Sequence, residues 1–544
     1  MATITPRDLM YSVAQKPVSI PSTAQTRKFL PITSGVYTAT SNNIVRIPVN
    51  ANAFVDLKNA MLRYSLKNTG ANPVALDGSS ASWISRLNIL GPDGAPLETI
   101  DNYNRLYQAL SQLERSRDNI QGITSLIEGT SVGSRRLRVV GSAASTLQFQ
   151  LDGVVAGTLN LAGDDTVAIG DYRFVAATTT LIAYYKGVSG GTITYATGAG
   201  NTNASVVPGL RFGGAGTDST TLTLNGITIG NGSGSIEVEI PWRTARLNDI
   251  IPNGNTYYYA HNLLSTLTKL DVLYPAFAVG GGGVVVEITL APVQEVLNAG
   301  DVVGTAPNYE ISNVEMIAPV IQYPDAVIQS FKQMVMAQGA VNMSSVSFQN
   351  FVYPISAAAT TVSIPLAMRC RSLKALYFAF QPNSSTTDYS YPRSSARESP
   401  LTMSYQLRVG SQYFPASLVQ YSTTTGAGGL AEAVMELEKS VSKLSDIRHG
   451  SVFNRENFVL PEVSGGTALF GIDLEASAIS YMENGVNTAD NSLTMYLELS
   501  NLTFTTQAGV VTPTLQGTAG NVYVWALFDN TLSILPNGNI VATK

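Results

Sequence analysis

The two histidines of the chain, His261 and His449, are the first place to look for acid–base or nucleophilic chemistry. A hydrolase triad needs a histidine beside a nucleophile, and the Gly-x-Ser-x-Gly pattern occurs twice, at 129–133 and 187–191. That motif requires a strand before it and a helix after it, whereas strand-like residues follow both patterns. We interpret both patterns as chance matches in loops and both histidines as structural or surface residues whose hydrogen bonds are satisfied.

Glycine clusters, paired acids and tyrosines offer no stronger site. Gly280–Gly283 lacks the Lys-Ser/Thr pair and the helix of a phosphate-binding loop, and the glycines of 230–234 lead into a strand. Asp164 and Asp165 could divide acid and base roles, but adjacent strand residues point to opposite faces. Tyr257–Tyr259 could stack on sugars or bases, or could lie at a subunit contact. We therefore expect no enzyme activity, no catalytic or metal-binding residue and no cofactor.

The composition indicates a packed protein with unusually few charges. Of 544 residues, 44% are apolar, which is ordinary, but only 13% are charged, against about 25% in typical globular domains. Such a chain can form large cores, and its low charge indicates that much of its surface faces other protein chains. A net charge of −5 argues against a protein held on nucleic acid by phosphate contacts, so we expect no specific nucleic-acid binding.

The cysteine count and the hydropathy pattern bear on where the protein works. Cys370 is the only cysteine, so no intrachain disulfide can form, which fits a reducing compartment. The N-terminal residues lack the apolar core of a signal peptide, and no run of about 18 apolar residues occurs. We expect a protein that is neither conventionally secreted nor membrane-spanning.

Alternation of apolar and polar residues predicts β-strands in both halves of the chain and an all-β fold. The clearest segments are 62–67, 236–240 and 286–290 in the first half and 403–409, 493–499 and 521–528 in the second. Beyond the first 41 residues, helical spacing occurs in three segments, 102–114, 324–338 and 430–444. Two of them carry stripes that we expect to face a core: Tyr103, Leu106, Leu110 and Leu113 in one, and Leu430, Val434, Leu437 and Val441 in the other.

The order of these elements repeats. A strand at 85–90, a turn, a short strand and the helix at 102–114 correspond to a strand at 405–409, a turn, a short strand and the helix at 430–444. Farther along, 236–240 would correspond to 470–475. A repeat this long indicates duplicated domains, because solenoid units have about 20–50 residues.

These patterns divide the chain into segments. We expect an N-terminal arm at 1–41, a first β-sandwich at 42–297, a linker at 298–307, and a second sandwich with a C-terminal tail at 308–544. A β-rich insertion occupies 141–233, and a smaller one occupies 382–400. The arm carries one helix signal, made by Thr5, Pro6, Leu9, Met10 and Val13.

Two tandem sandwiches with a helix at the same place in each, an arm and a large insertion resemble the double jelly-roll major capsid proteins of tectiviruses, adenoviruses, virophages and Polinton-like viruses. The resemblance is greatest to the Polinton-like and virophage group and covers about residues 42–535. The segments that carry it are 83–90 with 99–107, and 308–316, which opens the second half.

The resemblance implies two tandem jelly rolls and a homotrimer that forms a pseudo-hexagonal capsomer of an icosahedral DNA-virus capsid. The protein would be made inside the host cell and incorporated in the virion. The insertion at 141–233 would form an outer tower. The arm around residues 5–13 would lie inside, against neighbouring capsomers, minor and penton proteins, or an internal membrane where the virion has one.

Three alternatives remain open at this level. A carbohydrate-binding or carbohydrate-cleaving protein, such as a phage spike or lectin-like domain, predicts acids and aromatics gathered in one groove. A minor or penton capsid protein could be built on similar sandwiches. A surface-layer or secreted adhesion protein is disfavoured because a signal peptide is lacking.

Overall fold

The computed structural model describes the two sandwiches and parts of the insertion. The described residues are 21–129 except 34, 72–73 and 117–118; strand segments within 135–240; 250–298; 307–382 except 357–358; and 394–544 except 396, 424–427, 442–449, 454–457, 460–465, 476–483, 490–493 and 505–518. None of the helices in these residues is long and apolar enough to span a membrane.

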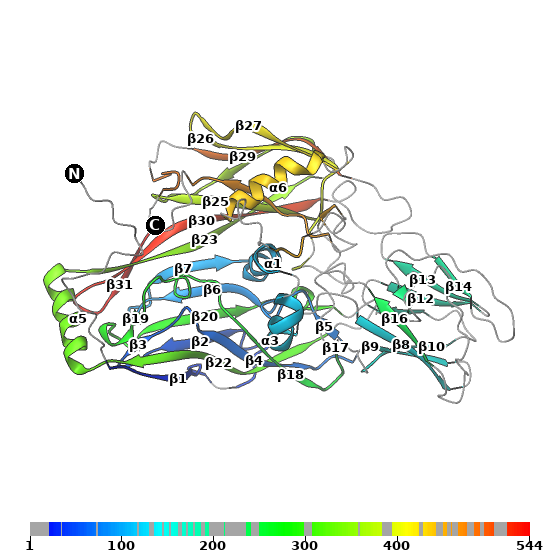
Figure 1. Ribbon diagram of the computed structural model, residues 1–544, viewed down its shortest axis with the longest axis horizontal. Coiled ribbons are helices and arrows are strands. Elements are labelled where there is room, and N and C mark those ends of the chain that lie inside the picture. Colours follow the sequence, from blue (N-terminus) through cyan, green and yellow to red (C-terminus); the bar gives the residue numbers. More distant parts are fainter. Residues whose placement is uncertain are drawn as a thin grey trace, which may run out of the picture.

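The first half is a sandwich of two principal sheets (Figure 1). Its strands are β1 Thr23–Phe29, β2 Ile44–Val49, β3 Phe54–Val55, β4 Met61–Asn68, β5 Val74–Leu76, β6 Ile84–Leu90, β7 Pro96–Asp101, β17 Ile250–Ile251, β18 Thr256–His261, β19 Tyr274–Pro275, β20 Val284–Leu290, β21 Leu297–Asn298 and β22 Tyr309–Gln322. One sheet has the order β1-β22-β4-β18, with β3 and β19 at one end, and the other has the order β2-β20-β6-β7. The short strands β17, β5 and β21 form a small third sheet.

The second half has the same construction. Its strands are β23 Val341–Ile355, β24 Val362–Leu366, β25 Leu373–Pro382, β26 Thr402–Val409, β27 Gln412–Ser422, β28 Phe470–Asp473, β29 Met495–Thr503, β30 Gly520–Ile534 and β31 Ile540–Thr543. The sheets have the orders β23-β30-β25-β28 and β24-β29-β26-β27, and β31 pairs with β30. Strand for strand, these orders match those of the first half, which confirms two tandem jelly rolls.

One predicted correspondence is wrong. The segment 236–240 was matched with 470–475, but it forms β16 (Ser235–Ile240) in the sheet of the insertion. β18 takes the equivalent place instead, because it pairs with β4 as β28 pairs with β25. Both β16 and β18 are short strands, and their sequences alone do not show with which partner each one pairs.

The sheets also differ from the predicted segment boundaries. β1 falls within the expected arm, yet it pairs with β22 along its whole length, from Thr23 opposite Gln322 to Phe29 opposite Met316. β22 follows the expected linker, yet it pairs with β4, starting at Tyr309 opposite Asn68. The first sandwich therefore includes 23–29 and 309–322, because its closing strands come from sequence on both sides of it.

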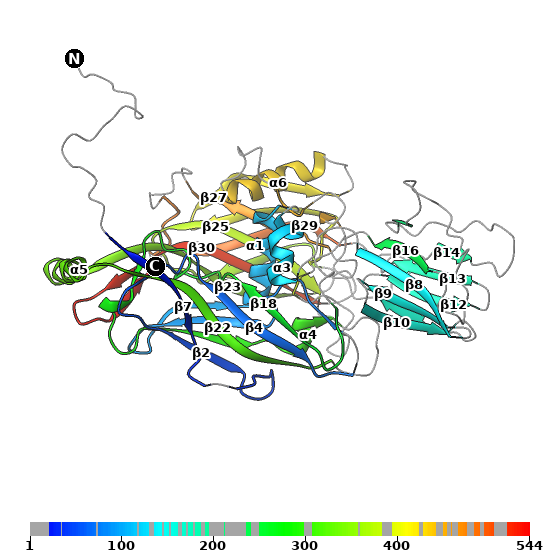
Figure 2. The same cartoon turned by 60° about the horizontal axis from the view of Figure 1, so that its bottom comes forward.

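Helices are few. They are α1 Tyr103–Glu114, α3 Ser125–Glu128 after a π-helical turn at Ile120–Thr124, α4 Val293–Val296, α5 Asp325–Gln338 and α6 Gly428–Ser440, with a 3-10 turn at Ala276–Ala278. α1 follows β7 and α6 follows β27, so the helix lies at the same point of each jelly roll (Figure 1). α5 leads from β22 to β23 and projects at one end of the molecule in both views (Figures 1 and 2).

The two predicted helix stripes have different outcomes. Tyr103, Leu106, Leu110 and Leu113 of α1 are at most 4% exposed. In α6, Leu430 and Leu437 are buried, but Val434 is 37% exposed, and Val441 lies just past the helix, partly buried against the core. The buried line of α6 runs through Leu430, Ala433, Leu437 and Ser440. At 3.6 residues per turn, Ala433 takes the inward position that was predicted for Val434.

The insertion forms β-structure of its own, as predicted. Its strands are β8 Arg135–Ala143, β9 Thr146–Leu151, β10 Val154–Asn160, β11 Thr166–Ile169, β12 Tyr172–Ala177, β13 Thr180–Tyr185, β14 Gly191–Thr194, β15 Arg211–Phe212 and β16. They form the sheets β10-β9-β8-β16-β15 and β11-β12-β13-β14. Figures 1 and 2 show these strands beside the sandwiches, at the end away from α5.

Candidate functional site

The junction between the two sandwiches is the most elaborate polar feature of the described structure. β7 of the first sandwich lies against β23 and β31 of the second. Glu98 on β7 is 3% exposed, and its carboxylate accepts hydrogen bonds from the backbone N–H of Thr266 at 2.9 Å, from the Thr266 hydroxyl at 2.8 Å and from the Ser347 hydroxyl. Burial raises the pKa of this carboxyl, and these hydrogen bonds partly oppose the shift. Because Ser347 lies on β23, this network joins the two halves.

Arg105 of α1 makes a second connection. Its guanidinium pairs with Glu295 of the first half at 3.1 Å, and its Nε donates to Oε1 of Gln381 in the second half at 2.8 Å. The same group lies 4.6 Å from the centre of the Tyr523 ring, within cation–π distance. A buried guanidinium is stable only when it is paired, so these partners fix the two sandwiches relative to each other.

The smaller insertion, expected at 382–400, adds a third connection through its described residues. The backbone N–H of Ser394 donates to the Asp77 carboxylate at 2.7 Å, and the Ser395 hydroxyl donates to the same carboxylate. Arg397 is 2% exposed and donates to the Gln112 side chain at the end of α1. These contacts hold the C-terminal end of the insertion on the first sandwich, between the halves.

The equivalent helices α1 and α6 are covered unequally. The second sandwich packs over α1, so that even its polar side chains Asn104, Arg105, Gln108 and Gln112 are buried. α6 packs on β27 and β28 with one side, and on the other side Val434 and Met435 are 37% and 41% exposed. The described part of the chain has nothing that covers α6 as the second sandwich covers α1.

The edge strands that precede these helices, β7 and β27, also differ in how far the rest of the chain covers them. β7 is covered by β23, whereas its equivalent β27 is an edge strand that exposes Tyr413 and Leu418. β1 is the equivalent of β23, and six of its seven residues are exposed. Inside the chain, β7 of the first half packs against β23 of the second half. The equivalents of these two strands, β27 and β1, both expose residues to solvent.

The residues singled out in the sequence fall in several places. Thr5, Pro6, Leu9, Met10 and Val13 of the arm lie outside the described residues, as do Asp164, Asp165, His449 and 187–190. Gly281, Gly282 and Gly283 have positive φ angles in the loop before β20, and a Cβ on Gly283 would lie 2.3 Å from the Val49 carbonyl oxygen. The cluster is therefore a turn that requires glycine. In Tyr257–Tyr259, Tyr259 is buried and Tyr258 is 61% exposed, so the tyrosines share no single face.

His261 is buried at the end of β18, packed against the rings of Tyr64 and Tyr107. Neither ring nitrogen has a hydrogen-bond partner among the described residues. Burial, and then the nearby Arg115 guanidinium, lower the pKa of this histidine to about 3. The side chain is structural, which is one of the two roles expected, and it is neutral. The expectation that its nitrogens are satisfied by hydrogen bonds is wrong.

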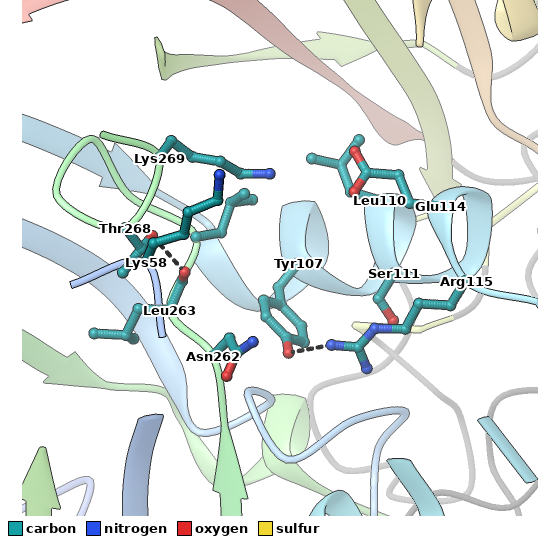
Figure 3. A pocket seen from close by; sticks show the side chains of 11 residues that line it. Lys58, Tyr107, Leu110, Ser111, Glu114, Arg115, Asn262, Leu263, Thr268 and Lys269 are labelled. Carbon is teal, nitrogen blue, oxygen red and sulfur yellow. Dashed lines mark hydrogen bonds between the residues drawn. The ribbon is translucent and has the colours of Figure 1, made fainter. Parts of the chain in front are cut away.

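A cavity of about 260 Å³ lies beside the C-terminal end of α1 (Figure 3). It is lined by Lys58, Tyr107, Leu110, Ser111, Glu114, Arg115, Asn262, Leu263, Leu264, Thr268 and Lys269. Figure 3 shows the Lys58 and Lys269 side chains across the cavity from Leu110 and Glu114. With one carboxylate and one aromatic ring in its lining, the cavity lacks the paired acids that glycoside hydrolysis requires. The described residues also contain no cluster of metal-ligating side chains.

Comparison with known proteins supports the fold. No protein-family model matches the chain. No curated protein matches it. Many solved structures are similar to the chain at low sequence identity, and three of them are described below. PBCV-1 VP54, fitted into a reconstruction of the virophage Sputnik, has a TM-score of 0.51 at 10% identity over 98% of this chain and 99% of its own.

Two further solved structures show the same likeness over nearly their whole length. The PBCV-1 virus capsid has a TM-score of 0.51 at 10% identity over 97% of this chain and 98% of its own. The Faustovirus major capsid protein has 0.50 at 9% identity over 96% of this chain and 92% of its own. Likeness at such identities concerns the fold, and it extends over nearly the whole chain. This protein therefore has the double jelly-roll fold of viral capsid proteins.

Proposed function

We propose that this protein is the major capsid protein of an icosahedral DNA virus and works in the virion shell. The observation that carries the proposal is the fold, shared over 96% or more of the chain with the PBCV-1 capsid and the Faustovirus major capsid protein. The low charge of the sequence supports it, since a shell subunit places much of its surface against other subunits. The function is assembly through interfaces and involves no turnover of a substrate.

The unequal cover of the two jelly rolls supports a specific mode of assembly. The edge strand β27 of one copy, together with the outer side of α6, docks on the exposed β1 of the next copy, repeating the contact that β7 makes with β23 inside each chain. Such a contact is heterologous, because two different surfaces meet, and it forms a ring when the rotation closes. Closure at three copies places six equivalent sandwiches around one axis, which gives a pseudo-hexagonal homotrimer.

The ring also gives expected positions for the insertion and for the N-terminal arm. The insertion at 141–233 forms an outer tower, because its strands lie to one side of the sandwiches (Figure 2). β1 begins close to the start of α5, so we expect the arm that precedes it to lie at this end of the subunit and to contact neighbouring capsomers, minor and penton proteins, or an internal membrane where the virion has one.

The mass of the purified native protein in solution tests the proposal. Light scattering should give a species of three times 57.7 kDa, and negative-stain images of the same fractions should show hexagonal outlines or closed shells. A monomer at all concentrations would contradict both the ring and the capsid role. Glycan binding by that monomer would support the alternative that the protein binds carbohydrate.

A further inference from the structure

α5 is a helix of 14 residues that the rest of the chain covers on one side only. Phe331 packs edge-on against Phe54 and Phe277, with ring centres 5.7 and 5.5 Å apart, and Val335 is 5% exposed. These contacts fix one face of α5 to the end of the first sandwich. The other residues of the helix are mostly exposed.

The outer face of α5 is poor in charge for a face that meets water. Met336 is 70% exposed and Met334 is 38% exposed, and the exposed positions between the two ends of the helix are otherwise alanine, serine, glutamine and one lysine. Asp325 and Lys332 are the only charged residues of the helix. A surface helix normally carries charged residues opposite its packed stripe, so this face has the composition of a contact surface.

The N-terminal segment enters the first sandwich directly beside this helix. Thr23, the first residue of β1, lies opposite Gln322, and α5 begins three residues later at Asp325. The segment before β1 contains the predicted helix with Leu9, Met10 and Val13 on its apolar side, flanked by Arg7 and Asp8. Like α5, this segment combines apolar residues with one acidic and one basic residue, so opposite charges are available for pairing when the two apolar sides meet.

The lengths permit docking within one chain. The nine residues 14–22 can span up to roughly 30 Å when extended. α5, with 14 residues, is about 21 Å long. Residues 5–13 can therefore reach any part of the outer face of α5, because β1, which follows them, starts close to that helix.

We propose that the outer face of α5, centred on Met336, is the docking site of residues 5–13 of the same chain, with Leu9, Met10 and Val13 as the apolar contacts. This pairing is a property of the single chain. It goes beyond the proposed capsid function, and its failure would leave the trimer measurement unaffected.

A disulfide test uses the fact that Cys370, the only native cysteine, is buried. In the full-length protein, Met10→Cys combined with Met336→Cys should form a disulfide on mild oxidation at least roughly tenfold faster than a control pair, because docking raises the effective concentration of the two thiols. The control pair is Met10→Cys with Leu126→Cys, since Leu126 on α3 is 87% exposed. The product should run as a single chain on a denaturing gel, with the two peptides linked in a digest. Equal rates for the two pairs would overturn the proposal, and so would a product of twice the chain mass, which would assign the site to the arm of another copy.

A second measurement does not depend on introduced cysteines. Peroxide oxidation of Met336 in the native protein should become at least about threefold faster when residues 1–15 are deleted, because a docked segment shields the thioether. Met61 of β4, which is partly exposed and lies outside both α5 and the proposed contact between copies, serves as the internal reference and should keep its rate. An unchanged Met336 rate in the deletion variant would refute docking at this face.

Discussion

The Nε of Arg105 in the first jelly roll donates a hydrogen bond of 2.8 Å to Oε1 of Gln381 in the second, 276 residues farther along the chain. The same guanidinium pairs with Glu295 of its own jelly roll. One buried side chain of α1 therefore has partners in both halves, and its position depends on both being folded. The two jelly rolls form one unit with a continuous core.

Arg105→Ala should lower the free energy of unfolding by about 3–5 kcal/mol, because it removes a buried guanidinium with partners in both halves and leaves the partly buried Glu295 without its cation. The matched control is Arg86→Ala, whose ion pair with Asp101 is about half exposed and should be worth roughly 0–1 kcal/mol. Urea unfolding of both variants measures the difference. A loss for Arg105→Ala no larger than that for Arg86→Ala would show that the junction does not depend on this residue.

Leu437→Asp should abolish soluble trimer, because Leu437 is 1% exposed in the core of the second jelly roll and a buried carboxylate there has no partner. Val434→Asp, one turn away and 37% exposed, should leave the chain folded and shift light scattering from trimer to monomer. Circular dichroism separates unfolding from dissociation. A normal trimer from Val434→Asp would exclude the outer face of α6 from the ring contact.

Deletion of residues 1–15 should leave trimers intact but impair the assembly of shells. The deletion ends before β1, so the pairing of Thr23–Phe29 with β22 is retained and the first jelly roll keeps its edge strand. Light scattering reports the trimer, and electron microscopy of assembly reactions reports the shells. Shells of normal yield and size from the truncated chain would refute an assembly role for the arm.

Replacement of residues 141–233 by a short turn should leave a soluble trimer. β8 and β16 are antiparallel neighbours, with Val140 opposite Ser235, so a tight turn of a few residues can join them. Soluble yield, mass and thermal unfolding check the outcome. Reproducible insolubility would place the insertion within the structural core.

Stability should fall with acid through His261. The pKa of its folded form is about 3, below the ordinary value of 6.5, so the unfolded chain takes up the proton first. The stabilisation from neutral burial is complete above pH 6.5 and is lost as the pH falls from 6.5 toward 3, with a slope of up to about 1.4 kcal/mol per pH unit. His261→Phe, which keeps a ring between Tyr64 and Tyr107, should flatten the dependence in this window.

The control for this titration is His449→Gln, which changes the other histidine of the chain. Urea unfolding from pH 4 to 7 should give the wild-type slope for His449→Gln and a smaller slope for His261→Phe. The same slope in all three proteins would mean that other groups account for the acid dependence.

The sequence predicted what depends on local pattern and missed what depends on distant pairing. Alternation located β4, β20, β26 and β29, and helical spacing located α1, α5 and α6. The place of β1 in the first sheet could not be predicted, since its partner β22 lies almost 300 residues away and a short alternating segment carries no sign of its partner. For the same reason, β16 was matched with β28 from the sequence, although the structural equivalent of β28 is β18.

The polar junction was missed for a different reason. Glu98, Arg105 and Gln381 belong to no motif, and each would be ordinary on a surface. The available signal was α1 itself, where Asn104, Arg105, Gln108 and Gln112 flank an apolar stripe on a short helix; in isolation such residues indicate a solvated side. Only the packing of a second domain over that side explains their burial.

The antiparallel pair of β8 and β16 also makes the insertion a suitable place for a foreign domain. Because β8 and β16 run side by side in the sheet of the insertion, both ends of any segment that joins them leave this strand pair about 5 Å apart. A foreign domain whose own termini are close together, such as an antigen or an affinity module, can replace the residues between Val140 and Ser235 without straining the β8–β16 pair. On a closed shell every subunit would present the foreign domain in the same orientation, at a spacing set by the ring.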